Sequence, residues 1–577
     1  MSACPIAQDV PEYVHLVGAG KFEKAFDVIY GRNPLPFMTG HLCDHACTEN
    51  CTRRDWEGAV RIREVKRIAA ERGYGPFVVS GTLSGRKSGP RGVKAAVIGA
   101  GPAGLAAASF LAREGFEAHV FEREHEPGGV VRWLLPGFRL PAEAIAKDVS
   151  LLRDLGVKFH LDQRETPTLD ELFGRGSRYI LVAIGAETDR AIGIEGTREV
   201  LSFLREFRED PSRPALGRTV AVIGAGDTAM DAARAAKRCR GVEEVRIVYR
   251  RSEKEMPASR EEYEAARTEG VEFKFLRAPE SWQGGKLRCS VMELAEPDET
   301  GRSRPVATGG TEEIEADAVI TAIGADVDAR ALAEMGFPGP DLPFDPATQE
   351  TSIEGVFLVG DAASGAATIV KAIASARRAV DSICAREGGS HFRTQAVPRD
   401  TAAALRRERD GLIPVSATGA EEAEVGSTES RRCLGCQAFC GKCVEVCPNR
   451  ANTIVAVGGG LRDEVQIVHL DALCNECGNC ATFCPWDGKP YRDKLTVFSS
   501  EEDFRSSANP GFFLAAGRGS LRVGLETREL ILDEAGTIAP EAIPPAAGED
   551  AARAALLEVV QAIVRDHSYL LGPVDTR

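Results

Sequence analysis

The chain lacks any uninterrupted apolar run of the roughly 20 residues that a membrane-spanning helix requires. It begins MSACPIAQDVPEY, and Asp9 and Pro11 stand where a secretory signal would need its apolar stretch. These two absences argue against a membrane span and against export. We therefore expect a soluble, cytoplasmic protein with no membrane partner.

Positive charge is also in the minority. The 71 Lys and Arg residues are outnumbered by 86 Asp and Glu residues, which gives a net charge of −15. Nucleic acid is therefore not expected as a main partner, because binding its phosphates needs a basic surface. The 577 residues, 43% apolar and 27% charged, are typical of a soluble protein with several domains.

Cysteines are few outside three short stretches of the chain. The three scattered residues, Cys239, Cys289 and Cys384, are expected to be core or surface thiols. The other 13 of the 16 lie at residues 4–51, 433–447 and 474–484. Such local clustering does not suit a large disulfide framework, and it predicts metal or iron–sulfur ligation.

A dinucleotide-binding motif follows the first apolar run of residues 93–124. Gly99, Gly101 and Gly104 form G-x-G-x-x-G between a strand pattern and an Ala-rich helix pattern. The glycines permit a tight turn, close approach of a pyrophosphate and close helix–strand packing. Glu122 ends the next strand, where a carboxylate accepts hydrogen bonds from a ribose. The alternative is a glycine-rich turn used for packing only.

A second copy of this motif occupies residues 218–251. Gly224 and Gly226 fill the first two positions, and Ala229 takes the third, which the motif tolerates. The following strand ends in Arg250 and Arg251 rather than in an acid. An arginine pair would hold a 2′-phosphate, so the sequence favours NADP over NAD, unless the two arginines form a solvated face.

The order of the motifs assigns the cofactors. After the second copy the chain reads GVFLVGDAASGAATIVKAIASAR, and its Gly360-Asp361 pair is typical of the return to the first nucleotide fold in two-dinucleotide flavoproteins. Asp361 would face the ribityl–phosphate of a flavin, and the helix after Ser364 would direct its N-terminus at the flavin ring. The first site is thus expected to hold FAD, and the inserted second site NADP(H) or NAD(H).

A redox-active cysteine pair is missing. The stretch GGVVRWLLPGFRLP after the first motif has no cysteine, and Cys239 and Cys289 are far apart in sequence. A disulfide reductase is therefore not expected, and electrons leaving the flavin would pass to the cysteine clusters.

The C-terminal cysteines match the pattern of bacterial ferredoxins. CNECGNCATFCP is C-x2-C-x2-C-x3-C-P, and CLGCQAFCGKCVEVCP is a partner run with one wider spacing. Cys433 is spare in this pairing or replaces Cys436, and structural zinc is the alternative. The expected sets are Cys436, Cys440, Cys443 and Cys484 on one [4Fe–4S] cluster, and Cys474, Cys477, Cys480 and Cys447 on the other.

The N-terminal cysteines predict a third [4Fe–4S] cluster. Its candidate ligands are Cys4, Cys43, Cys47 and Cys51, with zinc or structural thiols as the alternative. The predicted fold class is α/β, with two Rossmann-like domains, an N-terminal helical Fe–S module and a C-terminal 2[4Fe–4S] ferredoxin-like domain. The expected domains are 1–90 (helical Fe–S module), 91–205 with 330–390 (FAD), 206–329 (NAD(P)), 391–430 (polar linker), 431–495 (ferredoxin-like) and 496–577 (small α/β tail with a hairpin and a helix).

Specific stretches resemble known families. CPIAQDVPEY, GAGPAGL, LPGFRLP, GAGDTAMDAAR and VYRRSEKEMPA resemble the glutamate synthase small subunit and the NADPH-oxidising half of dihydropyrimidine dehydrogenase, and are similar to NADH-dependent ferredoxin:NADP oxidoreductase. The C-terminal third resembles the "putative selenate reductase" family. The resemblance implies FAD contacts from Gly99, Gly101, Gly104, Glu122, Arg123, Gly129, Arg139, Gly360, Asp361 and Thr368, and NADPH contacts from Gly224, Gly226, Asp227, Thr228, Arg250 and Arg251.

The sequence departs from these families in two ways. Relatives with a paired cluster module have further cysteines upstream of the CP that Cys4 matches, so one N-terminal cluster is expected instead of two. Cys51 is the chosen fourth ligand, although the matching cysteine of relatives belongs to the other cluster. The selenate-reductase relatives also carry a long additional N-terminal region, so any substrate site located there would lie on another polypeptide or be absent.

These features predict an electron-input subunit of a hetero-oligomeric complex. Electrons would pass from NAD(P)H through FAD to [4Fe–4S] clusters and on to a partner subunit or ferredoxin, or in the reverse direction, with no catalytic side chain. The alternatives are a non-catalytic electron-relay or assembly subunit and a glutamate synthase small subunit. Flavin-based bifurcation is left open, as is the terminal electron acceptor.

Overall fold

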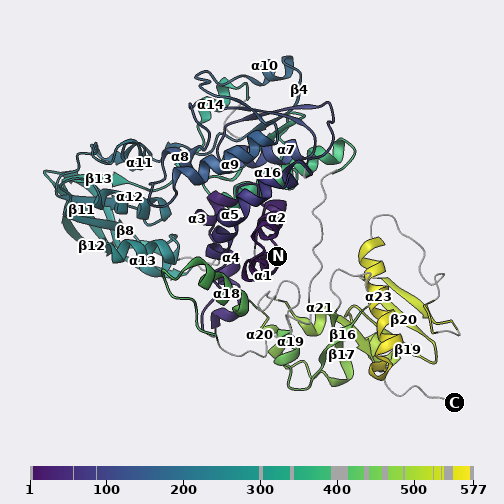
Figure 1. Ribbon diagram of the computed structural model, residues 1–577. Coiled ribbons are helices and arrows are strands. Elements are labelled where there is room, and N and C mark those ends of the chain that lie inside the picture. Colours follow the sequence, from purple (N-terminus) through teal and green to yellow (C-terminus); the bar gives the residue numbers. More distant parts are fainter. Residues whose placement is uncertain are drawn as a thin grey trace.

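The computed structural model describes most of the chain. The residues outside its description are 1–3, 56, 86, 298–302, 338–342, 391–412, 434–440, 458–464, 485–487, 524–525, 534–535, 539–549 and 572–577. Among the helices in the remainder, none combines the length and the apolar character needed to cross a bilayer. Figure 1 shows two nucleotide-binding units with the N-terminal helices beside them, and a C-terminal unit to one side.

The first nucleotide-binding unit contains a parallel five-stranded sheet in the order β15-β4-β1-β2-β3. Its strands are β1 (Lys94–Ile98), β2 (Glu117–Phe121), β3 (Lys158–His160), β4 (Ser177–Val182) and β15 (Val356–Leu358). Its helices are α7 (Pro102–Arg113), α8 (Val130–Trp133), α9 (Ala142–Asp154), α10 (Leu169–Gly174), α14 (Ala329–Glu334), α15 (Asp361–Ser364) and α16 (Ile369–Arg386). Strand β15 pairs with β4, so the chain returns to this sheet after the second unit.

The packing of strand β1 on both of its faces explains why its sequence is an unbroken apolar run. Ala95 and Val97 belong to the core cluster with α7, α9 and α16, whereas Ala96 and Ile98 belong to the cluster with α10 and α14. Successive strand residues point to opposite faces, and both faces of a parallel sheet are covered by helices. The sheet is therefore buried on both sides.

The second unit repeats this plan with the sheet order β6-β13-β7-β8-β9. Its strands are β6 (Arg198–Glu199), β7 (Thr219–Ile223), β8 (Glu244–Tyr249), β9 (Glu272–Phe275) and β13 (Ala318–Thr321), and its helices are α11 (Val200–Glu209), α12 (Asp227–Lys237), η2 (Glu253–Glu255) and α13 (Arg260–Thr268). Because β6 and α11 pack here, this unit begins before the predicted boundary at residue 206. The pair β5 (Thr188–Asp189) and β14 (Ala325–Asp326) joins the segments that enter and leave the unit.

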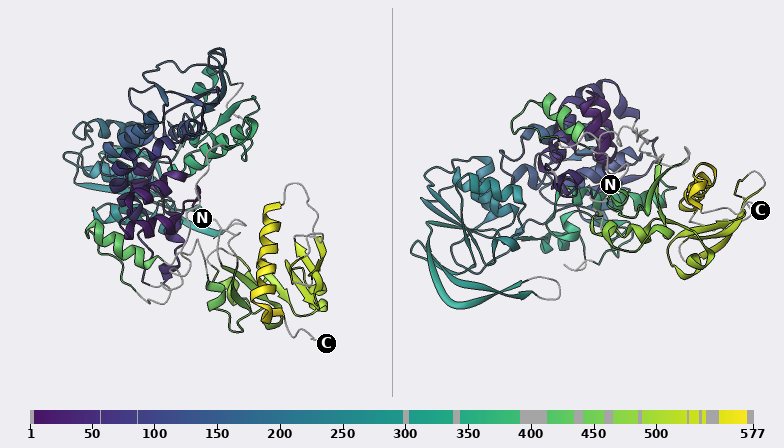
Figure 2. Two further views of the ribbon diagram at one scale, coloured as in Figure 1. Left: turned by 45° about the vertical axis from the view of Figure 1, so that its right-hand side comes forward. Right: turned by 90° about the horizontal axis from the view of Figure 1, so that it is seen from below.

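An antiparallel sheet extends from the second unit. It consists of β10 (Arg277–Gln283), β11 (Lys286–Pro297) and β12 (Ser303–Glu315). Figure 2 shows the long β11–β12 hairpin projecting away from the body of the molecule.

The N-terminal module is helical, as the sequence predicts. Its elements are α1 (Val10–Gly18), α2 (Phe22–Arg32), α3 (Pro36–Leu42), α4 (Ala46–Glu49), η1 (Thr52–Asp55), α5 (Ile62–Val79) and α6 (Thr82–Gly85). Phe26 and Tyr30 share one apolar core with α7 and α16. The fully buried carboxylate of Asp148 on α9 also accepts hydrogen bonds from the amides of Phe37 (3.1 Å) and Met38 (2.8 Å) in the first turn of α3. The module is therefore packed firmly on the first nucleotide-binding unit.

The predicted polar linker at 391–430 is wrong for its last part. Residues 391–412 lie outside the described part, but α18 (Glu422–Arg432) is a helix packed on α1 and α5 of the N-terminal module. Its buried face includes Val425, Glu429 and Arg432. The segment has the composition of a polar connector because a buried ion pair, Glu429 with Arg432, supplies half of the buried residues of that face.

The C-terminal unit has one six-stranded sheet in the order β16-β17-β18-β19-β20-β21. Its strands are β16 (Asn452–Ala456), β17 (Val465–Leu470), β18 (Leu495–Phe498), β19 (Gly511–Ala515), β20 (Arg518–Val523) and β21 (Glu526–Ile531). Its helices are α19 (Lys442–Glu445), η3 (Asp471–Leu473), α20 (Asn479–Thr482), α21 (Pro490–Asp493), α22 (Glu501–Ser506), α23 (Asp550–Asp566) and η5 (Ser568–Leu571). The expected hairpin and helix of the tail are present, but β18 pairs with β17, so no domain boundary falls at residue 495.

Candidate functional site

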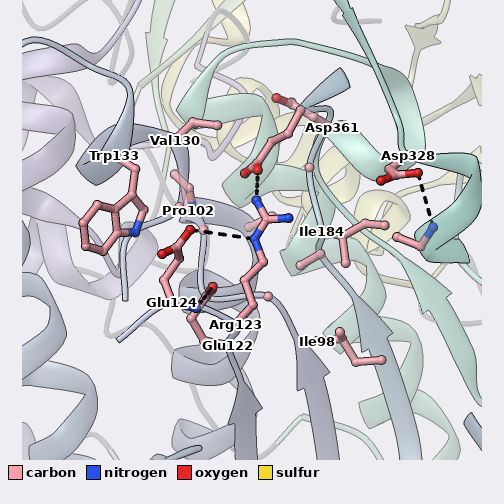
Figure 3. A pocket seen from close by; sticks show the side chains of 18 of the residues that line it. Ile98, Pro102, Glu122, Arg123, Glu124, Val130, Trp133, Ile184, Asp328 and Asp361 are labelled. Carbon is pink, nitrogen blue, oxygen red and sulfur yellow. Dashed lines mark hydrogen bonds and ion pairs between the residues drawn. The ribbon is translucent and has the colours of Figure 1, made fainter. Parts of the chain in front are cut away.

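A cleft opens at the carboxyl ends of β1, β2, β4 and β15 of the first unit (Figure 3). Its empty space is about 1350 Å³, including the solvent at its mouth. Ligands of open α/β sheets bind at this edge of the strands. Seven of the residues expected to bind FAD line it: Gly99, Gly101, Glu122, Arg123, Gly129, Asp361 and Thr368.

The glycines of the first motif divide into two kinds. A Cβ on Gly99, where φ is +97°, would lie 2.5 Å from the carbonyl oxygen of Ala183, and one on Gly104 would lie 2.0 Å from that of Gly99. For a Cβ on Gly101, the nearest atom among its described neighbours would be Cα of Gly129, at 3.9 Å. Gly99 and Gly104 are thus required by packing, whereas Gly101 leaves room for a ligand to approach the backbone.

The Glu122 carboxylate is held by the backbone around it. It accepts hydrogen bonds from the amides of Ala100 (2.6 Å) and Glu124 (3.0 Å). Burial raises the pKa of Glu122 above its usual value, against the effect of these two amide donors. The neighbouring Arg123 forms an ion pair with Glu187. The carboxylate is therefore fixed at the end of β2, where a ribose diol would donate to it.

Asp361 and Thr368 bring a helix N-terminus to the other side of the cleft. The Asp361 Oδ1 accepts the amide of Ala367 at 3.1 Å, and burial raises the pKa of Asp361 to about 6. Thr368 is the N-cap of α16, and its hydroxyl accepts the amide of Lys371. Gly360 lies just behind, where a Cβ would be 2.5 Å from Cβ of Ala103.

Trp133 also lines the cleft, although it belongs to no motif that would have indicated this role. Its indole Nε1 is buried and has no hydrogen-bond partner among the described residues. A buried donor normally has a partner, so this N–H would suit an acceptor on a bound molecule. Figure 3 shows Trp133 beside Val130, at the side of the cleft.

The second motif repeats the geometry of the first. A Cβ on Gly224, where φ is +127°, would lie 2.1 Å from the carbonyl oxygen of Ala322, whereas one on Gly226 would meet no described atom within 4 Å. Asp227 begins α12 and accepts the amide of Ser259 at 2.8 Å, and the next residue, Thr228, is exposed.

The two arginines after β8 differ in their surroundings. Arg250 is exposed. Arg251 is partly buried, and its Nε is a buried donor that has no partner in the described part of the chain. Such a buried guanidinium N–H is suited to donate a charge-assisted hydrogen bond to a phosphate oxygen.

Arg139, which the resemblance implied as a flavin contact, forms its ion pairs with the second unit. It is absent from the lining of the cleft, and its guanidinium forms ion pairs with Asp231 (2.5 Å) and Glu262 (2.9 Å) of the second unit. Asp231 is almost fully buried, and burial raises its pKa to about 7, against the effect of Arg139. Arg139 therefore joins the two nucleotide-binding units. The partners are far apart in sequence, so no local pattern could have indicated them.

The four N-terminal cysteines lie around the end of α3 and α4. Cys4 and Cys43 pack against the core shared with the first unit, and Cys47 and Cys51 pack against the core around α1. Burial raises the pKa of the Cys47 thiol to about 12, and the charge of Cys43 adds to this rise. The backbone amide of His45 donates to Sγ of Cys43 at 3.4 Å, and His45 Nε2 is bonded to Glu261 at 3.0 Å.

The C-terminal cysteines form a second group. Cys447, Cys474, Cys477 and Cys480 line one small pocket, together with Asn452 and His469. The charges of Cys480 and Cys447 contribute to a raised pKa of Cys474, after the larger effect of burial. This is one of the two sets expected from the sequence. Of the other set, Cys443 and Cys484 are described, and Cys436 and Cys440 lie outside the described residues.

Nowhere in the described chain do three or more His, Cys, Asp or Glu side chains come close enough to hold a single metal ion. A [4Fe–4S] cluster has a different requirement, because each of its four thiolates binds a different iron. Thiols that surround a common space without converging on one point are compatible with such a cluster.

Comparison with known protein families agrees with this geometry. The family model "pyridine nucleotide-disulphide oxidoreductase" matches residues 93–380, and the model "dihydropyrimidine dehydrogenase domain II, 4Fe-4S cluster" matches residues 1–74. The glutamate synthase (NADPH) small chain of Azospirillum brasilense is 34% identical over 66% of this chain and 84% of its own length. The chain belongs to the pyridine nucleotide-disulphide oxidoreductase family.

Other relatives in this family are longer. The "Putative oxidoreductase YgfK" of Escherichia coli K12 is 42% identical over 100% of this chain and 55% of its own length, so the chain spans about half of that protein. The NADP(+)-dependent formate dehydrogenase subunit beta of Moorella thermoacetica is 36% identical over 66% of this chain and 59% of its own length. Among solved structures, FprA from Mycobacterium tuberculosis in complex with NADPH matches 58% of this chain and 99% of its own, with a TM-score of 0.42 and 18% identity.

The name of this family refers to a disulphide reaction, but the three scattered cysteines of this chain are core residues. This agrees with their prediction as core or surface thiols. Cys239, Cys289 and Cys384 are all buried. Burial raises the pKa of Cys239 to about 11 and the pKa values of Cys289 and Cys384 to about 12. Thiols with such raised pKa values are poor nucleophiles at neutral pH, which does not suit a dithiol reaction.

Proposed function

We propose that the chain is an NAD(P)H-oxidising flavin and iron–sulfur oxidoreductase subunit. Electrons pass from NAD(P)H through FAD to [4Fe–4S] clusters, and from there to a partner subunit or ferredoxin. The observation that carries the proposal is the cleft in which Gly101, Glu122 and the N-terminus of α16 face one space. Two of the relatives are named as an NADP(+)-dependent formate dehydrogenase subunit beta and a glutamate synthase (NADPH) small chain, which supports this assignment.

The residues of the cleft suit the parts of FAD. Backbone near Gly101 would accept the pyrophosphate, and Glu122 would hold the adenosine ribose. Asp361 would face the ribityl chain, and the α16 N-terminus would stabilise negative charge on the flavin ring. When bound, FAD supplies the conversion between a two-electron hydride and single electrons. Side chains of this chain then position cofactors, and none is needed as an acid or base.

The inserted unit suits a nicotinamide nucleotide with a 2′-phosphate. The open space at Gly226 leaves the N-terminus of α12 accessible to a pyrophosphate. Arg250 and the Nε of Arg251, which has no hydrogen-bond partner among the described residues, favour NADPH over NADH. A charge-assisted hydrogen bond to a phosphate would satisfy that buried donor.

Three [4Fe–4S] clusters complete the proposal, one in the N-terminal module and two in a ferredoxin-like C-terminal unit. The pocket at Cys447, Cys474, Cys477 and Cys480 supports one of the C-terminal clusters. The hairpin β16–β17 connects the two cysteine runs, which is the connection expected between the cluster-binding runs of a ferredoxin. A larger complex would receive these electrons, in keeping with relatives that are named as subunits.

The test is anaerobic reduction of the holoprotein by NADPH. Bleaching of the flavin absorption band, followed by the electron paramagnetic resonance (EPR) signals of reduced clusters, is the expected result. The variant Gly226→Glu places a carboxylate in open space, where it repels the pyrophosphate without a packing clash. It should keep its FAD and its reduction by dithionite but lose reduction by NADPH. A wild-type flavin that stays oxidised with both NADPH and NADH would refute the proposal and favour an electron-relay subunit.

A further inference from the structure

Helix α18 ends at the N-terminal cysteines, although it lies about 380 residues further along the chain. Cys433 directly follows α18 and is buried in the same apolar cluster as Tyr13, against which Cys47 also packs. Cys51 packs against this cluster as well. Thiols from two segments that are far apart in the sequence therefore meet beside α1.

The backbone at Cys433 is held in place from two sides. His15 Nε2 on α1 donates to the carbonyl oxygen of Cys433 at 3.1 Å. The Nε of the buried Arg53 donates to the carbonyl oxygen of Arg432 at 2.9 Å. Helix α1 approaches α18 so closely that a Cβ on Gly18 would lie 2.2 Å from Ser430. Cys433 is thus held against the N-terminal module by hydrogen bonds to the backbone as well as by the burial of its own side chain.

The surroundings of these thiols suit an anionic cluster. The amide of His45 donates to Sγ of Cys43 at 3.4 Å. An N–H donor to sulfur stabilises a thiolate-bound iron–sulfur cluster.

From this arrangement we propose that Cys433 is the fourth thiolate of the N-terminal [4Fe–4S] site, together with Cys4, Cys43 and Cys47. A cubane takes four thiolates, so this set is complete without Cys51. Cys433 is then part of neither C-terminal cluster. The inference rests on the N-terminal cluster of the proposed function, and it makes that site dependent on a segment that follows both nucleotide-binding units.

The first test compares Cys433→Ser with the matched control Cys51→Ser in the full chain, prepared without oxygen. We expect C433S either to lose about four irons and four sulfides per chain or to keep a serine-ligated cluster with a changed EPR spectrum. C51S should keep both the iron and the spectrum of the wild type. FAD content is the internal check of folding, because the flavin cleft contains neither residue. An unchanged cluster in C433S, or a lost one in C51S alone, would overturn the inference.

The second test uses the wild-type protein and so does not depend on a variant that folds. Iron is removed with a chelator, the thiols are mildly oxidised, and disulfide-linked peptides are identified by mass spectrometry. Links from Cys433 to Cys4, Cys43 or Cys47 are expected. Links from Cys433 only to cysteines of the C-terminal unit would refute the inference. A wild-type protein that never contains an N-terminal cluster would instead refute that part of the proposed function.

Discussion

The buried ion pair of α18 allows a quantitative prediction. Arg432 and Glu429 are both fully buried, and Arg432 Nη1 lies 2.6 Å from Glu429 Oε2. The arginine also donates to the carbonyl oxygens of Ile413 (3.1 Å), Ala59 (3.1 Å) and Gly58. The substitution Arg432→Met keeps an apolar side chain of similar length but removes all of these donors. It leaves the carboxylate of Glu429 buried without its cationic partner.

Removing one partner of a buried ion pair costs about 3–5 kcal/mol. Glu429 would keep hydrogen bonds from the amide and hydroxyl of Ser416 and from the amide of Arg61. The lower end of the range, about 3 kcal/mol, is therefore the better expectation. Since about 1.4 kcal/mol corresponds to a factor of ten, the opened population of α18 should rise at least about 100-fold.

Hydrogen exchange followed by mass spectrometry measures this opening directly. Peptides from α18 should exchange at least about 100-fold faster in R432M, while those of β7 in the second nucleotide-binding unit stay unchanged. The neighbouring Arg431 is exposed, so Arg431→Met is the matched control. The combination with Glu429→Gln should recover part of the loss, because the remaining buried charge is the main cost. Equal exchange of α18 in R432M and R431M would refute the argument.

Three further predictions concern the sites. Arg251→Met should raise the Kd for NADPH about 10–100-fold, because it removes a charge-assisted hydrogen bond, and should change the Kd for NADH less than about twofold. Equal losses of affinity for both nucleotides in a binding titration would contradict this role. Cys474→Ser should remove about four irons while FAD content stays constant, and an unchanged iron analysis would count against the C-terminal set. The hydrogen bond from His45 and the ion pair with Arg63 lower the pKa of Glu261 to about 2. The contribution of the Glu261 carboxylate to the stability of the folded protein is therefore complete above about pH 4.5 and is lost as the pH falls towards 2. The unfolding midpoints of wild type and Glu261→Gln should therefore differ at pH 6 and converge near pH 2, and a constant difference would exclude this ion pair as the cause.

The nucleotide-binding units could be predicted from sequence because their signals are local. The strand before Gly99, the helix after Gly101 and the acid at Glu122 lie within one stretch of about 30 residues. Each glycine then has a role that its contacts explain, namely packing for Gly99 and Gly104 and open space for Gly101. The same reasoning predicted that the nicotinamide unit is an insertion in the first unit. The predicted boundary at residue 206 was too late, because β6 and α11 already belong to the inserted unit.

Other features could not be predicted because they depend on distant partners. Helix α18 buries Glu429 and Arg432, so its sequence has the polar composition of a connector. The resemblance implied a flavin contact for Arg139, but it could not indicate the ion pairs of Arg139 with Asp231 and Glu262 of the second unit. In both cases a charged side chain is buried in a contact between segments that are far apart in the chain. Hydrophobic periodicity carries no signal of such contacts.

The anchoring of α18 also limits the distance between the N-terminal module and the C-terminal unit. Cys433 is held on the N-terminal module, and Cys443 belongs to the C-terminal unit only ten residues later. A stretch of that length spans at most about 35 Å even when fully extended. The C-terminal unit therefore stays within that distance of the N-terminal module, at any protein concentration. The N-terminal and C-terminal cluster sites of the proposed function would then remain neighbours whatever partner either of them contacts.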